Sequence, residues 1–290
     1  MRLPIELPII IIWCVVEIMR NAAVAGQFYP GNKEEAEEIV EKCFSGAREK
    51  VGPVSAYAGV APHAGYLYSG VPAAATFLGI KELADAETVV VAGPNHTGIG
   101  GLVALSTEDW KLPTGVVKND REFGGEMARN ANFLKPGEEA HRFEHSIEVQ
   151  LPFLQHINPK AKIVPVCMMD QSMEGARDVA DAVLAAEKTL GRKVVVLASS
   201  DFSHYVPSAA AERADKAALE HICGLDAEAF QRDRRAQEWS ICGYGPISVS
   251  ILYAKAKGSK KGLELMYTNS GEVTGDYSRV VAYASIIFPR

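Results

Sequence analysis

The feature that most constrains the fold is a pattern that occurs three times: an apolar run, then a histidine within two to six residues. In the clearest case the β-branched run 88–91 leads into the turn 92–98, which contains His96. Gly and Pro restrict the backbone of this turn and give it a defined shape. Open α/β sheets bind ligands just outside the carboxyl ends of their strands, so the pattern predicts a site at such an edge.

The other two cases are residues 55–61, followed by His63, and residues 193–198, followed by His204. The run 193–198 is almost continuously apolar, which is typical of a strand buried on both faces. Amphipathic segments alternate with these runs and predict helices at 72–78, 121–131, 173–189, 208–222 and 246–257. We therefore expect a single α/β domain with a central, mainly parallel or mixed β-sheet flanked by helices.

Composition excludes several classes of protein. The chain has 290 residues, of which 48% are hydrophobic and 23% charged, and this is enough to build one sizeable core. A net charge of -6 gives no reason to expect a nucleic acid or an anionic membrane as partner. The five cysteines are scattered and odd in number, which argues against a disulfide scaffold and favours the cytoplasm.

The chain begins with an apolar stretch. We expect residues 1–20 to form an N-terminal apolar extension and residues 21–290 to form the domain. The run 7–16 is too short to span a bilayer as a helix, and its acidic flanks, Glu6 and Glu17, argue against a signal peptide. Such an extension would pack on its own domain or on a partner subunit, as in a homodimer.

Neutral imidazole is the commonest metal ligand in proteins, so His63, His96 and His204 could gather around a metal ion if their strands are parallel neighbours. Alternatively, each is an ordinary hydrogen-bonded loop histidine. Asp201 lies three residues before His204. Its carboxylate could fix the tautomer of that imidazole, or it could cap the following turn.

Cys242 differs from the other cysteines because glycines and a proline follow it and a predicted helix starts just after it. A helix N-terminus stabilises a thiolate, the form that binds metal. A buried, inert thiol is the alternative, and it is the better interpretation of Cys14, Cys43, Cys167 and Cys223. Glu144, His145 and Glu148 are further candidates, although Glu148 could equally be a solvated helix residue.

Six short segments, in order along the chain, resemble motifs of the Memo family. They are residues 25–30 (AGQFYP), 62–66 (PHAGY), 93–96 (GPNH), 144–148 (EHSIE), 200–205 (SDFSHY) and 242–246 (CGYGP). Each segment is short, but six in order make a specific match that covers the chain from about residue 21 onward.

The resemblance implies a fold similar to the class III extradiol dioxygenases, in which two histidines and a glutamate hold non-haem Fe(II). The two metal histidines correspond to His63 and His96, and Cys242 takes the glutamate position. His204 falls where the dioxygenases have a proton-handling histidine, with Asp201 beside it. The resemblance further implies a substrate pocket formed by Phe28, Tyr68, Asn95, Glu144 and His145.

The resemblance also implies bound iron or copper and a redox role, with a small molecule or a peptide as ligand. Eukaryotic members are proposed to bind phosphorylated peptides, but they carry Trp where this chain has Phe28. In many prokaryotes the family occurs near radical-SAM and AMMECR-like genes, which suggests partners in a shared pathway. A thiolate in place of a carboxylate favours softer metals such as Cu(I) and makes catechol cleavage doubtful.

Three hypotheses therefore remain open. The first is a metal-dependent oxidoreductase, with His204 and Asp201 as the acid/base pair. The second is a binding module without turnover that holds a phosphate or carboxylate, although Arg142 is the only arginine close to the motifs. The third is a zinc hydrolase, because two histidines, a cysteine and a water form a known catalytic zinc set.

Overall fold

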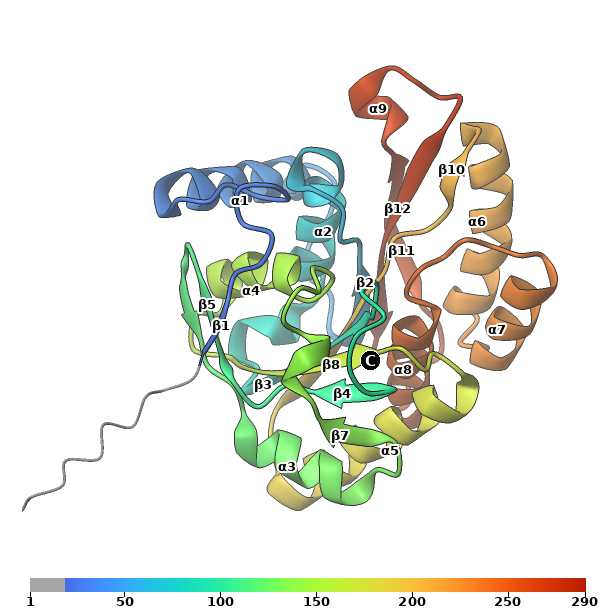
Figure 1. Ribbon diagram of the computed structural model, residues 1–290. Coiled ribbons are helices and arrows are strands. Elements are labelled where there is room, and N and C mark those ends of the chain that lie inside the picture. Colours follow the sequence, from blue (N-terminus) through green and yellow to red (C-terminus); the bar gives the residue numbers. More distant parts are fainter. Residues whose placement is uncertain (1–18) are drawn as a thin grey trace, which may run out of the picture.

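The computed structural model describes residues 19–290 (Figure 1). In this part of the chain the main sheet has nine strands, in the order β10-β12-β2-β9-β3-β8-β4-β7, with β11 paired to β12. Its strands are β2 (Ala56–Ala61), β3 (Thr88–Pro94), β4 (Val103–Leu105), β7 (Leu134–Pro136), β8 (Lys162–Met168), β9 (Val194–Ser199), β10 (His204–Val206), β11 (Leu263–Asn269) and β12 (Val280–Pro289). The chain is thus a single α/β domain with a mixed sheet, as predicted.

The centre of the sheet is parallel. Strand β9 pairs with β2 on one side and β3 on the other, and β3 also pairs with β8. Val90 lies at this centre, in register with Val196 and Val164, and all three are fully buried. Continuous apolar runs of this kind are typical of strands that are covered on both faces. Since β2, β9 and β3 are parallel neighbours, their carboxyl ends lie side by side, as the sequence pattern required.

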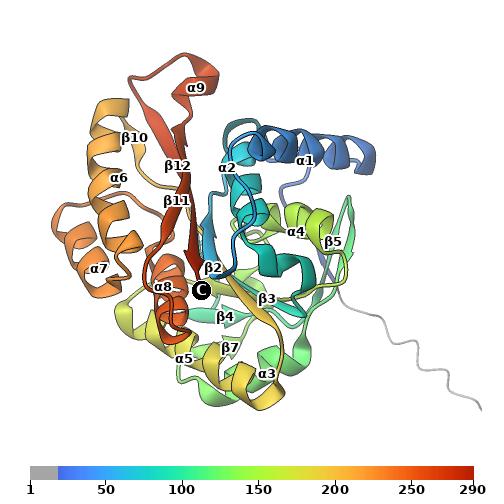
Figure 2. The ribbon, with the colours of Figure 1, turned by 180° about the vertical axis from the view of Figure 1, so that it is seen from behind.

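Helices cover both faces of the sheet. They are α1 (Lys33–Arg48), α2 (Tyr66–Gly79), α3 (Arg121–Asn130), α4 (Leu151–Ile157), α5 (Met173–Leu190), α6 (Ser208–Cys223), α7 (Ala227–Ala236), α8 (Tyr244–Ala256) and α9 (Gly271–Thr274), with 3-10 turns η1 (Lys81–Asp85), η2 (Glu138–Ala140) and η3 (Glu148–Gln150). Helices α1, α2 and α4 lie on one side, and α6 and α7 on the other (Figures 1 and 2). Alternate residues of each central strand feed two separate apolar cores, Val90 one and Val89 the other.

Local signals explain several helix boundaries. The side chains of Asn32, Asp120 and Ser172 cap the first turns of α1, α3 and α5, and Gly191 ends α5 in the left-handed conformation. Helix α2 differs from the prediction, because it begins at Tyr66 rather than near residue 72. The Tyr66 hydroxyl donates to the Val149 carbonyl at 2.6 Å, so a tertiary contact holds the early turn.

The N-terminal part of the described chain belongs to a small second sheet. Strand β1 (Met19–Asn21) pairs in parallel with β5 (Asp109–Leu112), which forms a hairpin with β6 (Gly115–Val117). The predicted boundary between residues 1–20 and 21–290 falls inside β1. The rest of the expected extension, residues 1–18 with Cys14, lies outside the described residues. From residue 19 onward, no helix has the length and apolar character needed to cross a membrane.

Candidate metal centre

Three histidines meet at the carboxyl edge of the parallel strands. His63 follows the end of β2 by two residues, and His96 follows the end of β3 by two. His145, from the loop before η3, joins them, with its ring centre 5.3 Å from that of His63 and 4.5 Å from that of His96. One nitrogen of each ring lies within 4.8 Å of the others. Nitrogens bound to one ion are at most about 4.2 Å apart, twice a metal–nitrogen bond, so small ring movements complete the set.

Glu144 fixes the tautomer of His96. Its Oε1 lies 2.9 Å from His96 Nδ1, and its Oε2 accepts the backbone N–H of His96. A carboxylate only accepts, so Nδ1 carries a proton, and in the tautomer that this bond selects the lone pair is on Nε2. Burial raises the pKa of Glu144, but the hydrogen bond from His96 and the charges of His96 and His145 bring it down to about 2. This buried carboxylate therefore remains an acceptor at neutral pH.

Ser199 fixes the tautomer of His63 in the same way. The Ser199 hydroxyl donates its one hydrogen to the Ser146 carbonyl at 2.6 Å and accepts from Gln150 Nε2 at 2.8 Å. His63 Nδ1, 2.9 Å away, can then only donate to it. Burial, together with His145 and His96, lowers the pKa of His63 well below its usual value. His63 is thus a neutral imidazole with an unprotonated Nε2, the form that binds metal.

Cys242 lies beside His63, with Sγ 3.2 Å from its Nε2, but outside the group of three histidines. The backbone N–H of Asp201 donates to the same sulfur at 3.3 Å. Burial, with a contribution from the charge of Asp201, raises the pKa of the thiol. The N-terminus of α8 was expected to lower the pKa of this thiol, but burial outweighs that effect. Only a bound cation would restore the thiolate.

Asp201 and His204 are arranged differently from the prediction. Asp201 accepts the backbone N–H of His63 at 2.7 Å, and burial raises its pKa to about 6. The ring of His204 is oriented instead by Ser240, whose carbonyl lies 2.8 Å from Nδ1. A carbonyl only accepts, so Nδ1 of this half-buried ring carries a proton, and Nε2 has no hydrogen-bond partner among the described residues.

The family of this chain follows from its similarity to known proteins. The model of the family described as Memo-like protein matches residues 20–287. The chain belongs to the Memo family. It is 42% identical over 280 residues to a MEMO1 family protein of Methanopyrus kandleri and 44% identical over 270 residues to one of Archaeoglobus fulgidus. Each match covers 93% of this chain and 99% of the relative.

The other residues predicted to form the substrate pocket of this Memo-family chain differ in their surroundings. The ring of Phe28 lies 4.7 Å from that of His145, at the edge of the histidine group. Tyr68, on α2, is partly exposed. The Asn95 side chain accepts from the backbone N–H groups of Thr97 and Gly98, so its hydrogen bonds shape the turn around His96.

Three features of this candidate metal centre differ from what the sequence predicts. His145 was expected in the substrate pocket, but the fold places its ring among the possible ligands. Glu148 is fully buried, which excludes its interpretation as a solvated helix residue. Arg142 is not the only arginine near the motifs, because Arg20 binds the Glu144 carbonyl and Arg234 stacks 4.0 Å above the Tyr244 ring. No local sequence signal predicts the Arg20 contact, which joins residues 124 positions apart.

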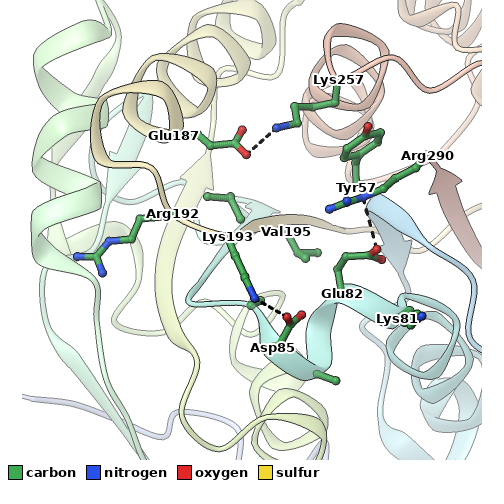
Figure 3. Close-up of a pocket in the computed structure, with 13 residues that line it drawn as sticks. Tyr57, Lys81, Glu82, Asp85, Glu187, Arg192, Lys193, Val195, Lys257 and Arg290 are labelled. Atoms are coloured by element: carbon green, nitrogen blue, oxygen red, sulfur yellow. Dashed lines mark hydrogen bonds and ion pairs between the residues drawn. The ribbon is translucent and has the colours of Figure 1, made fainter.

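A hollow of about 590 Å³ lies elsewhere on this Memo chain, at the amino ends of the parallel strands (Figure 3). Charged side chains line it, but they pair with one another across its walls. Lys257 binds Glu187 at 2.7 Å, Lys193 binds Asp85 at 2.7 Å, and Arg290 lies 3.4 Å from Glu82. The histidine group is at the opposite edge of the sheet.

Proposed function

We propose that this Memo-family chain binds a redox metal ion, iron or copper, at His63 and His96, with His145 and Cys242 as the adjacent donors. One observation carries the proposal: the ends of two parallel strands present imidazoles whose Nδ1 atoms are held by buried partners, so that Nε2 is the ring atom left to bind a metal. Metal-binding histidines are oriented in this way by outer hydrogen bonds.

The donor types support this choice of metal. Imidazole suits zinc, copper, iron and nickel, and an adjacent thiol favours the softer ions. A bound iron or copper ion would supply one-electron redox chemistry to a small substrate, as the resemblance to extradiol dioxygenases implies. Zinc with the same donors would instead make the chain a hydrolase.

The chain's own residues would handle protons. His204 Nε2 is free because Nδ1 is engaged by Ser240, and the charge of His204 acts on both His63 and Asp201. We propose His204 as the acid/base and Asp201 as a buried carboxyl that holds the backbone of His63 in place.

Metal analysis of anaerobically purified protein, with electron paramagnetic resonance, tests the proposal. We expect one iron or copper ion per chain, its loss in His63→Ala and His96→Ala, and a changed spectrum in His145→Ala and Cys242→Ser. Lys257→Met, at the opposite edge of the sheet, should retain the metal. Full metal content in both His63→Ala and His96→Ala contradicts the assignment, and stoichiometric zinc with no paramagnetic signal favours the hydrolase.

A second candidate is a peptide-binding module without turnover. Large apolar side chains within four positions of a site histidine in the sequence are exposed: Leu67, Phe143 and Tyr205 are each 65–69% exposed. Exposed apolar groups next to polar site residues are typical of a binding surface. Titration of metal-free protein with phosphorylated and unphosphorylated peptides tests this function. Tight binding that depends on the phosphate supports it, and equal weak binding of both peptides contradicts it.

A further inference from the structure

We propose that Arg20 is a positioning residue for the metal centre, which rests on the proposed function. Its guanidinium holds the loop of residues 141–148, which carries both Glu144 and His145. The segment that contains Arg20 is far from this loop in the sequence, and nothing in the resemblance assigns it a role.

The contacts of Arg20 leave little freedom. It is only 5% exposed, and its Nε and Nη2 donate to the carbonyls of His141 and Glu144, both at 2.7 Å. Its Nη1 donates to Glu148 at 2.7 Å. The guanidinium also stacks 3.9 Å above the Trp110 ring, and Arg20 pairs with Trp110 in the β1–β5 ladder. One planar group thus fixes both ends of the loop.

Glu148 completes the arrangement from the other side. It is fully buried, and its two oxygens accept four hydrogen bonds: from Arg20, from the backbone N–H groups of Ala23 and Val24, and from the Tyr29 hydroxyl. These bonds anchor residues 20–29 against η3. Phe28 lies in this segment and contacts His145. The Arg20–Glu148 pair therefore controls the loop on which His145 lies and the segment that packs against its ring.

Arg20 is connected to His96 through a single residue, Glu144. The Glu144 carbonyl is bound by Arg20, and the Glu144 side chain is bound by His96. If the carbonyl moves, the carboxylate that sets the tautomer of His96 moves with it. Buried ion pairs are often no more stabilising than well-packed apolar residues. The geometry thus points to alignment of the loop as the role of this pair.

Lysine cannot replace Arg20 in this role. The guanidinium offers five N–H donors in a rigid plane, whereas an ammonium is a compact point charge on a flexible stem. Arg20→Lys keeps the charge but cannot satisfy two carbonyls and a carboxylate in one plane. This variant therefore separates alignment from charge.

Two measurements test the proposal. In metal-free protein, long-range ¹H–¹⁵N spectra report the tautomer of each imidazole. We expect Arg20→Lys and Glu148→Gln to shift the ring signals of His96 and His145. In titrations with Co(II) alone, both variants should bind about tenfold or more weakly, with a changed visible spectrum, as outer-shell substitutions do. Leu83→Ala, a fully buried position in η1, is the matched control for general destabilisation.

The outcomes separate the two proposals. Wild-type ring signals in Arg20→Lys overturn the role of Arg20 whether or not the protein binds Co(II). Equal shifts in Leu83→Ala also overturn it, because loss of stability alone would then explain them. A wild-type protein that binds no Co(II) contradicts the proposed function, while the ring signals of the metal-free variants still decide the role of Arg20.

Discussion

The two edges of the central sheet differ in how their polar groups are used. At the carboxyl edge, Glu144 holds Nδ1 of His96, and the second ring nitrogen has no hydrogen-bond partner among the described residues. At the amino edge, Lys257 and Glu187 are partly exposed and bind each other (Figure 3). The first arrangement leaves a donor atom unused, whereas the second uses its charges within the chain.

This difference shows that the size of a hollow is a poor guide to chemistry. The amino edge has a hollow of about 590 Å³, but a ligand there would have to compete with existing ion pairs. At the carboxyl edge the imidazole nitrogens converge, and burial lowers the pKa values of His63 and His145, which is typical of functional sites. The following predictions test the contrast, from the largest expected effect to the smallest.

Gly243→Ala should have the largest effect. A Cβ at this position would meet the Ser199 carbonyl oxygen and lie 2.6 Å from Ser200 Cβ, so the loop that carries Cys242 must move. We expect a loss of about 3 kcal/mol in the free energy of unfolding, measured by urea denaturation. Gly52→Ala is the control, because a Cβ there meets nothing within 4 Å. Equal stability of both variants contradicts the close packing at this loop.

Glu144→Gln should weaken metal binding about 10- to 100-fold, or roughly 1.4–2.7 kcal/mol, because the amide no longer offers two carboxylate oxygens to His96 and its backbone. Titration with Co(II) measures this change. Glu187→Gln, at the amino edge, should bind Co(II) as the wild type does. A Glu144→Gln protein with unchanged affinity would show that this carboxylate does not set the His96 tautomer.

Acid should destabilise the carboxyl edge through buried imidazoles. Burial lowers the pKa of His141 to about 3 and that of His145 to about 4. Between those values and about 6.5 the unfolded chain binds more protons, so stability falls as the pH falls. Each group contributes up to about 1.4 kcal/mol per pH unit.

Denaturation midpoints from pH 7 to pH 4 check this slope. His141→Gln removes one titrating group and should reduce the slope, whereas Lys257→Met should keep it. The raised pKa of Asp201 opposes the trend between about 3.8 and 6, because there the folded chain binds more protons. A stability that is flat from pH 7 to pH 4 in the wild type would contradict neutral buried imidazoles.

Lys257→Met should have the smallest effect. Its ion pair with Glu187 is partly exposed, and such pairs contribute about 1 kcal/mol or less. We expect a small loss of stability by urea denaturation that fades at high salt, with unchanged metal content. A loss of several kcal/mol would mean that the amino edge holds the fold together more strongly than its exposure indicates.

Much of the fold could be predicted because its signals are local. The apolar runs of β2, β3 and β9 and the caps of α1, α3 and α5 occur in short stretches. Helix α2 could not be placed correctly, because residues 66–71 include an aromatic pair and a glycine with little helical preference. The stacking of Tyr66 against Tyr29 and Phe153 stabilises that turn, and such contacts are absent from a local pattern.

For the candidate site, the sequence alone determined that His63 and His96 follow strand ends, because strand period and turn chemistry are properties of neighbouring residues. Only the tertiary structure decided that His145 joins them, that Ser240 orients His204, and that Arg20 holds the loop of Glu144. These contacts join residues that are 36 to 124 positions apart. Their geometry depends on how the strands and loops pack, which no short segment contains.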